Sequence, residues 1–136
     1  WRPDIRDEKA KAMLSSDPVR RSVQDQWCLH DPALQVGHVT FGWLHEANMS
    51  CARLLRPELA EKIKVPCLLA LAGEDRLVDN DATRRLAQSM PQTEILELEG
   101  AMHEIFMERD DLRNRFLDAF DELLSKQELK TRVKPF

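Results

Sequence analysis

The sequence predicts an α/β fold in which parallel strands alternate with crossover helices, preceded by a helical segment. The run Pro66–Ala72 is continuously apolar, as expected of a strand that is covered on both faces of a sheet. The segment Thr93–Glu99 alternates apolar and acidic residues, which is typical of a strand nearer a sheet edge. A helical stretch follows each segment, and crossovers of this length imply parallel strands.

The size and composition are those of an ordinary globular chain. With 136 residues it is long enough for one domain or for part of a larger one, and it begins with Trp rather than Met. We therefore expect a piece of a longer translation product. The charged residues amount to 32% and their net charge is −4, with both signs interspersed, which argues against a nucleic-acid binder. No apolar run approaches the roughly 20 residues of a membrane-spanning helix, so we expect no integral membrane segment.

The cysteines bear on the cellular compartment. Their number is odd and no two are closely paired in sequence, at Cys28, Cys51 and Cys67. This pattern fits a reducing compartment better than a disulfide framework. We expect a cytoplasmic protein, with association at a membrane surface as an alternative.

Residues 1–64 read as helices. The triplet Ser16–Pro18 is a helix start signal, with a polar cap followed by proline in the first turn. Apolar residues then recur every four positions and predict one apolar helix face, at Val19, Val23 and Trp27. Thr40 is placed to cap a second helix, and Pro57 opens a short third one.

Residues 65–136 have the strand and helix order of a sheet domain. Asp79 is a predicted cap for the helix between the two strands, and Asp110 precedes a strongly amphipathic helix. Two parallel strands are too few for a stable domain of this class. The apolar first strand needs a neighbour on each side, so we expect further strands from an upstream segment or from a partner.

Two titratable side chains follow the ends of the two predicted strands, Asp75 and His103. Ligands of open α/β sheets bind beyond the carboxyl ends of the strands. A carboxylate there can hydrogen-bond the imidazole, fix its tautomer and stabilise the imidazolium. Histidine accepts and releases protons near neutral pH, and a serine that it activates would complete an acyl-transfer site. Glu74 is a competing carboxylate, whereas Asp79 is better explained as a helix cap.

These residues carry a family resemblance. The segment GEDRLVD followed by EGAMHEIFME resembles the C-terminal part of an α/β-hydrolase, in particular the lysophospholipase and monoacylglycerol lipase-like serine hydrolases. The resemblance implies that Asp75 is the acid and His103 the histidine of a triad whose chain order is serine, acid, histidine. The segment DPALQVGHVTFGWLHEA resembles the cap of bacterial lysophospholipase-like members. Residues 1–64 would then be the cap segment, and residues 65–136 the C-terminal part of the catalytic core.

The resemblance also implies a substrate and an absent group. The expected substrate is a small lipid-derived ester such as a lysophospholipid or a monoacylglycerol, with no cofactor or metal. The family's Gly-x-Ser-x-Gly motif is missing, because none of the glycines has the required spacing, at Gly37, Gly42, Gly73 and Gly100. We therefore predict that the nucleophilic serine lies upstream of residue 1 and that the isolated chain is inactive.

Other functions remain open at this point. An upstream aspartate in place of the serine would make the protein an epoxide hydrolase or a dehalogenase, and a peptidase is possible on the same fold. A different class is a non-catalytic module that associates through its unpaired strand edge. In either class we expect a homo-oligomer or association with the missing N-terminal half.

The remaining candidates are weaker. Apolar cap residues are predicted to line an acyl-chain pocket, unless they pack the cap's own helices, at Trp27, Phe41, Trp43 and Leu44. Met102 lies beside His103 and is a further candidate for substrate contact. The histidines of the N-terminal half have spacings that fit no compact metal-ligand motif, at His30, His38 and His45.

Overall fold

The computed structural model describes residues 8–37 and 39–132, with side chains as far as residue 127. Its two strands, β1 (Cys67–Ala72) and β2 (Thr93–Leu98), form a parallel two-stranded sheet. The register pairs the first residues of the two strands with each other, and also the last two, Ala72 and Leu98. Both strands therefore end at the same rim. The predicted α/β class with adjacent parallel strands is confirmed.

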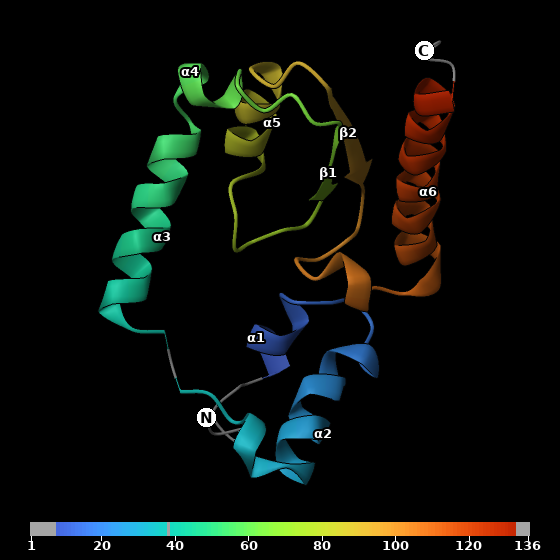
Figure 1. Ribbon diagram of the computed structural model, residues 1–136. Coiled ribbons are helices and arrows are strands. Elements are labelled where there is room, and N and C mark those ends of the chain that lie inside the picture. The colour runs from blue at the N-terminus through green and yellow to red at the C-terminus, as the bar shows by residue number, and fades with distance from the viewer. Residues whose placement is uncertain (1–7, 38, 133–136) are drawn as a thin grey trace.

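Two helices cover the sheet. α5 (Asn80–Gln88) crosses from β1 to β2, and α6 (Asp110–Arg132) follows β2. Both helices contact both strands, and they lie on opposite sides of the sheet (Figure 1). The predicted cap is present, since the Asp79 side chain accepts hydrogen bonds from the amides of Asp81 and Ala82 in the first turn of α5. This layering leaves the rim between the helices open for the loops that follow the strands.

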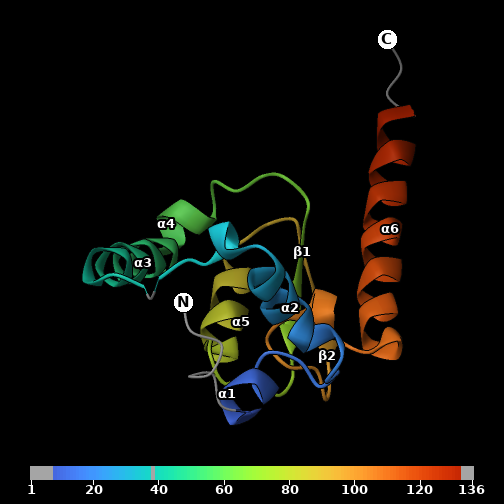
Figure 2. The same ribbon diagram turned by 90° about the horizontal axis from the view of Figure 1, so that it is seen from below.

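The N-terminal half is helical, as predicted. Its α-helices are α1 (Glu8–Ala12), α2 (Val23–His30), α3 (Phe41–Leu54) and α4 (Pro57–Ala60). Short 3-10 helices are η2 (Arg20–Ser22) and η3 (Pro32–Leu34), and a third, η4 (Ile105–Met107), follows β2. α1 and α2 lie across the carboxyl ends of the strands in both views, whereas α3 stands apart from the sheet (Figures 1 and 2). None of the helices in the described residues has the length and apolar content needed to cross a membrane.

The structure supports one part of the prediction for the helix after residues 16–18 and differs in another. The start signal is confirmed, since the Asp17 side chain accepts from the amides of Val19 and Arg20, and η2 runs directly into α2 at Val23. The predicted apolar face is exposed, with Val19 at 73% and Trp27 at 61%. The buried residues of α2 are Asp25 and Cys28. Asp25 forms an ion pair with α1, in which Lys11 Nζ lies 3.0 Å from Asp25 Oδ2.

The core lies directly beneath the rim where the strands end. It consists of small and branched apolar residues, Ala72, Leu98, Ala101 and Leu112, with Leu96, Ile105 and Phe116 packed against them. Gly73 follows β1 so closely against β2 that an added Cβ would stand 3.0 Å from Glu99 Cα and 3.1 Å from Leu98 O. Its amide donates to the Leu98 carbonyl at 2.9 Å, and the Glu74 amide donates to the Ala101 carbonyl at 2.9 Å. The two exit loops are therefore bound to each other.

Gly100 makes the turn that leads from β2 into the second loop. Its φ angle is +79°, a left-handed conformation that costs a residue with a Cβ about 1–2 kcal/mol. We expect Gly100→Ala to lower the free energy of unfolding by about this amount. Gly42→Ala is the matched control, because Gly42 lies in helix α3 with only one ordinary contact, and alanine there should raise stability by about 0.5–1 kcal/mol. Urea unfolding of both variants measures the difference, and a Gly100→Ala variant as stable as the parent would contradict the turn's role.

Candidate active site

Asp75 emerges from β1 two residues after Gly73, and its carboxylate is held on three sides. Oδ1 accepts from the amides of Leu77 at 2.8 Å and Val78 at 3.2 Å, and Oδ2 lies 2.9 Å from His103 Nδ1. The side chain is only 4% exposed. Burial alone would raise the pKa of Asp75, but the Leu77 amide, the His103 ring and the Val78 amide outweigh it, so the pKa lies below its ordinary value. The group is a carboxylate at neutral pH.

His103 emerges from β2 after the Gly100 turn. Its own amide donates to the Met13 carbonyl at 3.4 Å, and the next amide, of Glu104, donates to the Leu14 carbonyl at 2.7 Å. Because an ionised carboxylate can only accept, Nδ1 of the ring carries the proton that bonds Asp75. In the neutral ring Nε2 then carries the lone pair. With 34% of the side chain exposed, His103 can take up a proton from a group outside these loops.

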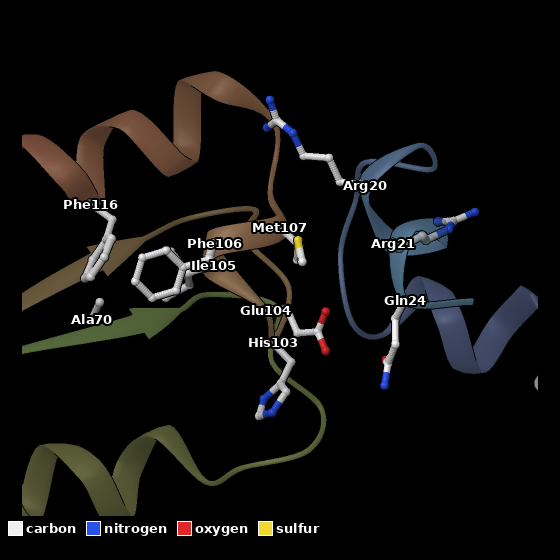
Figure 3. Close-up of a pocket in the computed structure, with 10 residues that line it drawn as sticks. All are labelled: Arg20, Arg21, Gln24, Ala70, His103, Glu104, Ile105, Phe106, Met107 and Phe116. Carbon is white, nitrogen blue, oxygen red and sulfur yellow. The ribbon is translucent and has the colours of Figure 1, made fainter. Parts of the chain in front are cut away.

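His103 borders a hollow of about 640 Å³ between the α1–α2 segment and the sheet. Figure 3 shows polar side chains on the side of the α2 segment, Arg20, Arg21 and Gln24, and across the hollow from them Glu104 beside His103. The opposite wall is apolar, with Phe106 and Phe116 in edge-to-face contact at a centroid distance of 4.9 Å. Arg20 is already engaged, since it donates to the Glu108 carbonyl and to Asp110 Oδ1 at 2.5 Å. The hollow therefore has one polar and one apolar wall beside the imidazole.

The structure brings together only some of the predicted site residues. Asp75 and His103 are in contact, and Glu74 is an exposed residue of the loop. The cap residues do not line the hollow beside His103: Trp27 is exposed, Phe41 is 93% exposed, and Trp43 and Leu44 lie on the exposed helix α3. Met102 is half-buried and lines a separate hollow of about 580 Å³ with Met13 and Arg76. A role for these five residues in substrate binding stays a prediction.

The described residues hold no group of three or more histidine, cysteine, aspartate or glutamate side chains arranged to bind a metal ion. His30 and His45 are exposed on α2 and α3, and His38 lies outside the described residues.

Sequence reasoning missed Glu108. This residue is fully buried, and its carboxylate accepts from the backbone amides of Met102 at 2.9 Å, Ser16 at 2.9 Å and Arg109 at 3.2 Å, and from the Ser16 hydroxyl. Burial opposes its ionisation, but the hydrogen bonds from Ser16, Met102 and Arg109 prevail and lower its pKa. The only signal in the sequence was its position at the end of the segment EGAMHEIFME, next to the acidic helix start.

The geometry agrees with the comparisons to known proteins. A family model described as serine aminopeptidase, S33, matches residues 3–110. The chain is similar to a probable lysophospholipase L2 of Haemophilus influenzae, with 30% identity over 97 residues that cover 71% of this chain and 30% of the relative. It is also similar to lysophospholipase L2 from two strains of Escherichia coli, K12 and O6:H1, with 29% identity over 103 residues and the same shares.

The chain thus spans 30% of the length of these curated relatives. The resemblance stated from the two loop segments is confirmed, since the matched region includes both loops and the parallel strands that carry them. The chain therefore belongs to the serine aminopeptidase S33 family of α/β-hydrolases, and it resembles the lysophospholipase-like serine hydrolases among them.

Proposed function

We propose that this chain supplies the histidine and the acid of a serine carboxylic-ester hydrolase that acts on lipid-derived esters. The observation that carries the proposal is the 2.9 Å contact between His103 Nδ1 and the buried Asp75 carboxylate, at the carboxyl ends of parallel strands. The substrate class follows from the relatives, which are named lysophospholipases. The chain would act within a larger protein, as its share of the relatives' length suggests.

The reaction uses His103 first as a base and then as an acid. Nε2 takes the proton of a serine hydroxyl while the serine oxygen attacks the ester carbonyl, and the Asp75 carboxylate stabilises the imidazolium formed. The imidazolium then gives this proton to the departing alcohol, which leaves an acyl-enzyme. In the second half Nε2 deprotonates a water that attacks the acyl group, and the proton returns to the serine. The proposed chemistry needs no cofactor.

The nucleophile is proposed to come from outside this chain. No serine of the described residues hydrogen-bonds the His103 ring, and the two that contact the segment after His103 are engaged elsewhere. Ser15 donates to the Met107 carbonyl at 2.6 Å, and Ser16 donates to Glu108. The sequence also lacks the Gly-x-Ser-x-Gly motif. The division into a cap at residues 1–64 and a core part at residues 65–136 is part of the same proposal.

The free edge of β1 supports association with further strands. Within the described residues β1 pairs only with β2, and its first four residues stay half-buried despite their apolar character. Unpaired strand edges recruit other strands. The proposed occupant is the rest of the same protein, and a second copy of this chain is the alternative. A non-catalytic module that only self-associates would use the same edge.

The first test is turnover of a p-nitrophenyl ester. We expect none from the 136-residue chain, and we expect His103→Ala in the intact protein to lower kcat by about 10²- to 10⁴-fold, the usual contribution of a general base. His45→Ala is the matched control, because His45 is exposed on α3 away from the hollow. Full activity of the His103→Ala variant would refute the proposal, and turnover by the isolated chain would refute the external nucleophile.

The second test concerns the bond that is cleaved. The family description names an aminopeptidase, whereas the relatives are named lysophospholipases. We expect the intact protein to release fatty acid from a lysophospholipid, with an aminoacyl arylamide hydrolysed far more slowly. Chromatographic quantification of both products decides, and preference for the arylamide would favour a peptidase on the same fold.

The third test uses the ionisation of Asp75. Its pKa is lowered in the folded protein from the ordinary value of 3.8, so the ionised group stabilises the fold fully above that pH. This stabilisation is lost as the pH falls through the folded value. The difference in unfolding free energy between the parent and Asp75→Asn should therefore be greatest at neutral pH and shrink below pH 3.8. Urea unfolding across this range measures it, with exposed Glu74→Gln as control, and a pH-independent difference would contradict the argument.

A further inference from the structure

Glu108 is a charged side chain enclosed by hydrogen-bond donors. Oε1 accepts from the amides of Ser16 and Met102, each at 2.9 Å, and Oε2 accepts from the Ser16 hydroxyl and from the Arg109 amide at 3.2 Å. Its residue is 0% exposed. A buried carboxylate is costly unless such bonds satisfy it. The proposed reaction does not use this group, so its position calls for a separate explanation.

The carboxylate joins the N-terminal segment to the loop that bears His103. Ser16 is 92 positions away in sequence, whereas Met102 immediately precedes His103. Other hydrogen bonds join the same two segments, residues 13–16 and residues 102–108, and we call this contact the seam. The Ser15 hydroxyl donates to the Met107 carbonyl at 2.6 Å, and the Glu104 amide donates to the Leu14 carbonyl at 2.7 Å. The loop is thus bound along its length to residues 13–16, and Glu108 is a charged group that contacts both sides.

His103 is held between two anchors in its own loop. On one side Ala101 is fully buried and its carbonyl accepts from the Glu74 amide at 2.9 Å. On the other side the Met102 amide donates a hydrogen bond to the Glu108 carboxylate. The first anchor ties the loop to the Asp75 loop, and the second fixes the peptide unit that leads into His103. Without the second anchor a half-buried donor loses its acceptor, and the imidazole can turn away from Asp75.

We propose that Glu108 is a positioning residue, which fixes the backbone before His103 against Ser16 and so keeps the imidazole Nδ1 on the Asp75 carboxylate. This inference rests on the proposed function, because it assigns Glu108 a role through His103. It also makes residues 13–16, in the segment assigned to the cap, part of the support of the histidine.

The hydrogen bonds of the seam require both carboxylate oxygens of Glu108 to act as acceptors. A carboxylate offers acceptors only, whereas the amide of glutamine would replace one oxygen by an NH₂ group. In Glu108→Gln the Met102 amide or the Arg109 amide then faces a donor. The volume is nearly unchanged, so the variant removes one of the two acceptors without opening a cavity.

The experiment compares Glu108→Gln with Asp25→Asn in the intact protein. Asp25 is also a buried acid, 4% exposed, but its ion pair with Lys11 joins α1 to α2. We expect Glu108→Gln to lower kcat for the ester about 10- to 100-fold, the usual cost of a small misplacement, with KM within about twofold of the parent. Asp25→Asn should lose stability but keep kcat. Both are assayed at a temperature where circular dichroism shows them fully folded.

A second readout does not depend on turnover. The Nδ1–H proton of His103 gives a downfield signal in the NMR spectrum of ¹⁵N-histidine-labelled protein, assigned by its absence in His103→Ala. We expect the signal to broaden or vanish in Glu108→Gln and to persist in Asp25→Asn. A retained signal together with an unchanged kcat would overturn the inference, and so would a kcat loss no greater than that of Asp25→Asn.

Two further variants test the positioning role where the Glu108→Gln comparison alone cannot. If Glu108→Gln does not fold, Ser16→Ala removes one donor and keeps the carboxylate, and we expect a smaller kcat loss, about two- to tenfold, with a weakened signal. An unchanged Ser16→Ala variant would then refute the positioning role. If His103→Ala leaves turnover intact, the proposed function fails, while the NMR signal still tests whether Glu108 orients the ring.

Discussion

The parallel pairing of β1 with β2 is the constraint on which the site depends. Because Ala72 lies opposite Leu98, both strands end at one rim, and the loops that follow them start side by side. The close approach at Gly73 and the hydrogen bond from the Glu74 amide to the Ala101 carbonyl then hold the loops together. A shift of one residue in this register would separate the carboxylate from the imidazole, although every residue involved would still be present.

Two buried carboxylates support His103 through different contacts. Asp75 contacts the ring directly, whereas Glu108 contacts the backbone that leads into it. Backbone amides stabilise the ionised form of both acids, and the pKa of each lies below its ordinary value. Fixed peptide dipoles thus keep two negative charges in a largely buried region beside a histidine. An imidazolium formed there meets a preorganised field and requires little rearrangement of its surroundings.

The features that could be predicted from the sequence are local ones. The apolar run of β1, the cap at Asp79 and the amphipathic α6 are each set by neighbouring residues, and the structure confirms them. The contact of Asp75 with His103 followed from the ends of two strands, once their parallel order was inferred. The burial of Asp25 on α2 was not predicted, since its partner Lys11 lies on a different helix. Glu108 was missed for a similar reason, since its partner Ser16 is 92 positions away.

The distribution of buried and exposed surface explains how the contact between Asp75 and His103 is supported beside a two-stranded sheet. The core beneath the rim, from Ala72 to Leu112, supports the two loops from within this chain, whereas β1 leaves four apolar residues half-buried and α3 leaves apolar residues exposed. The proposed association with further protein would cover this apolar surface. On the proposed function, the orientation of the imidazole is therefore internal to the chain. The distance from Nε2 to the attacking serine, in contrast, depends on whichever strand pairs with the free edge of β1.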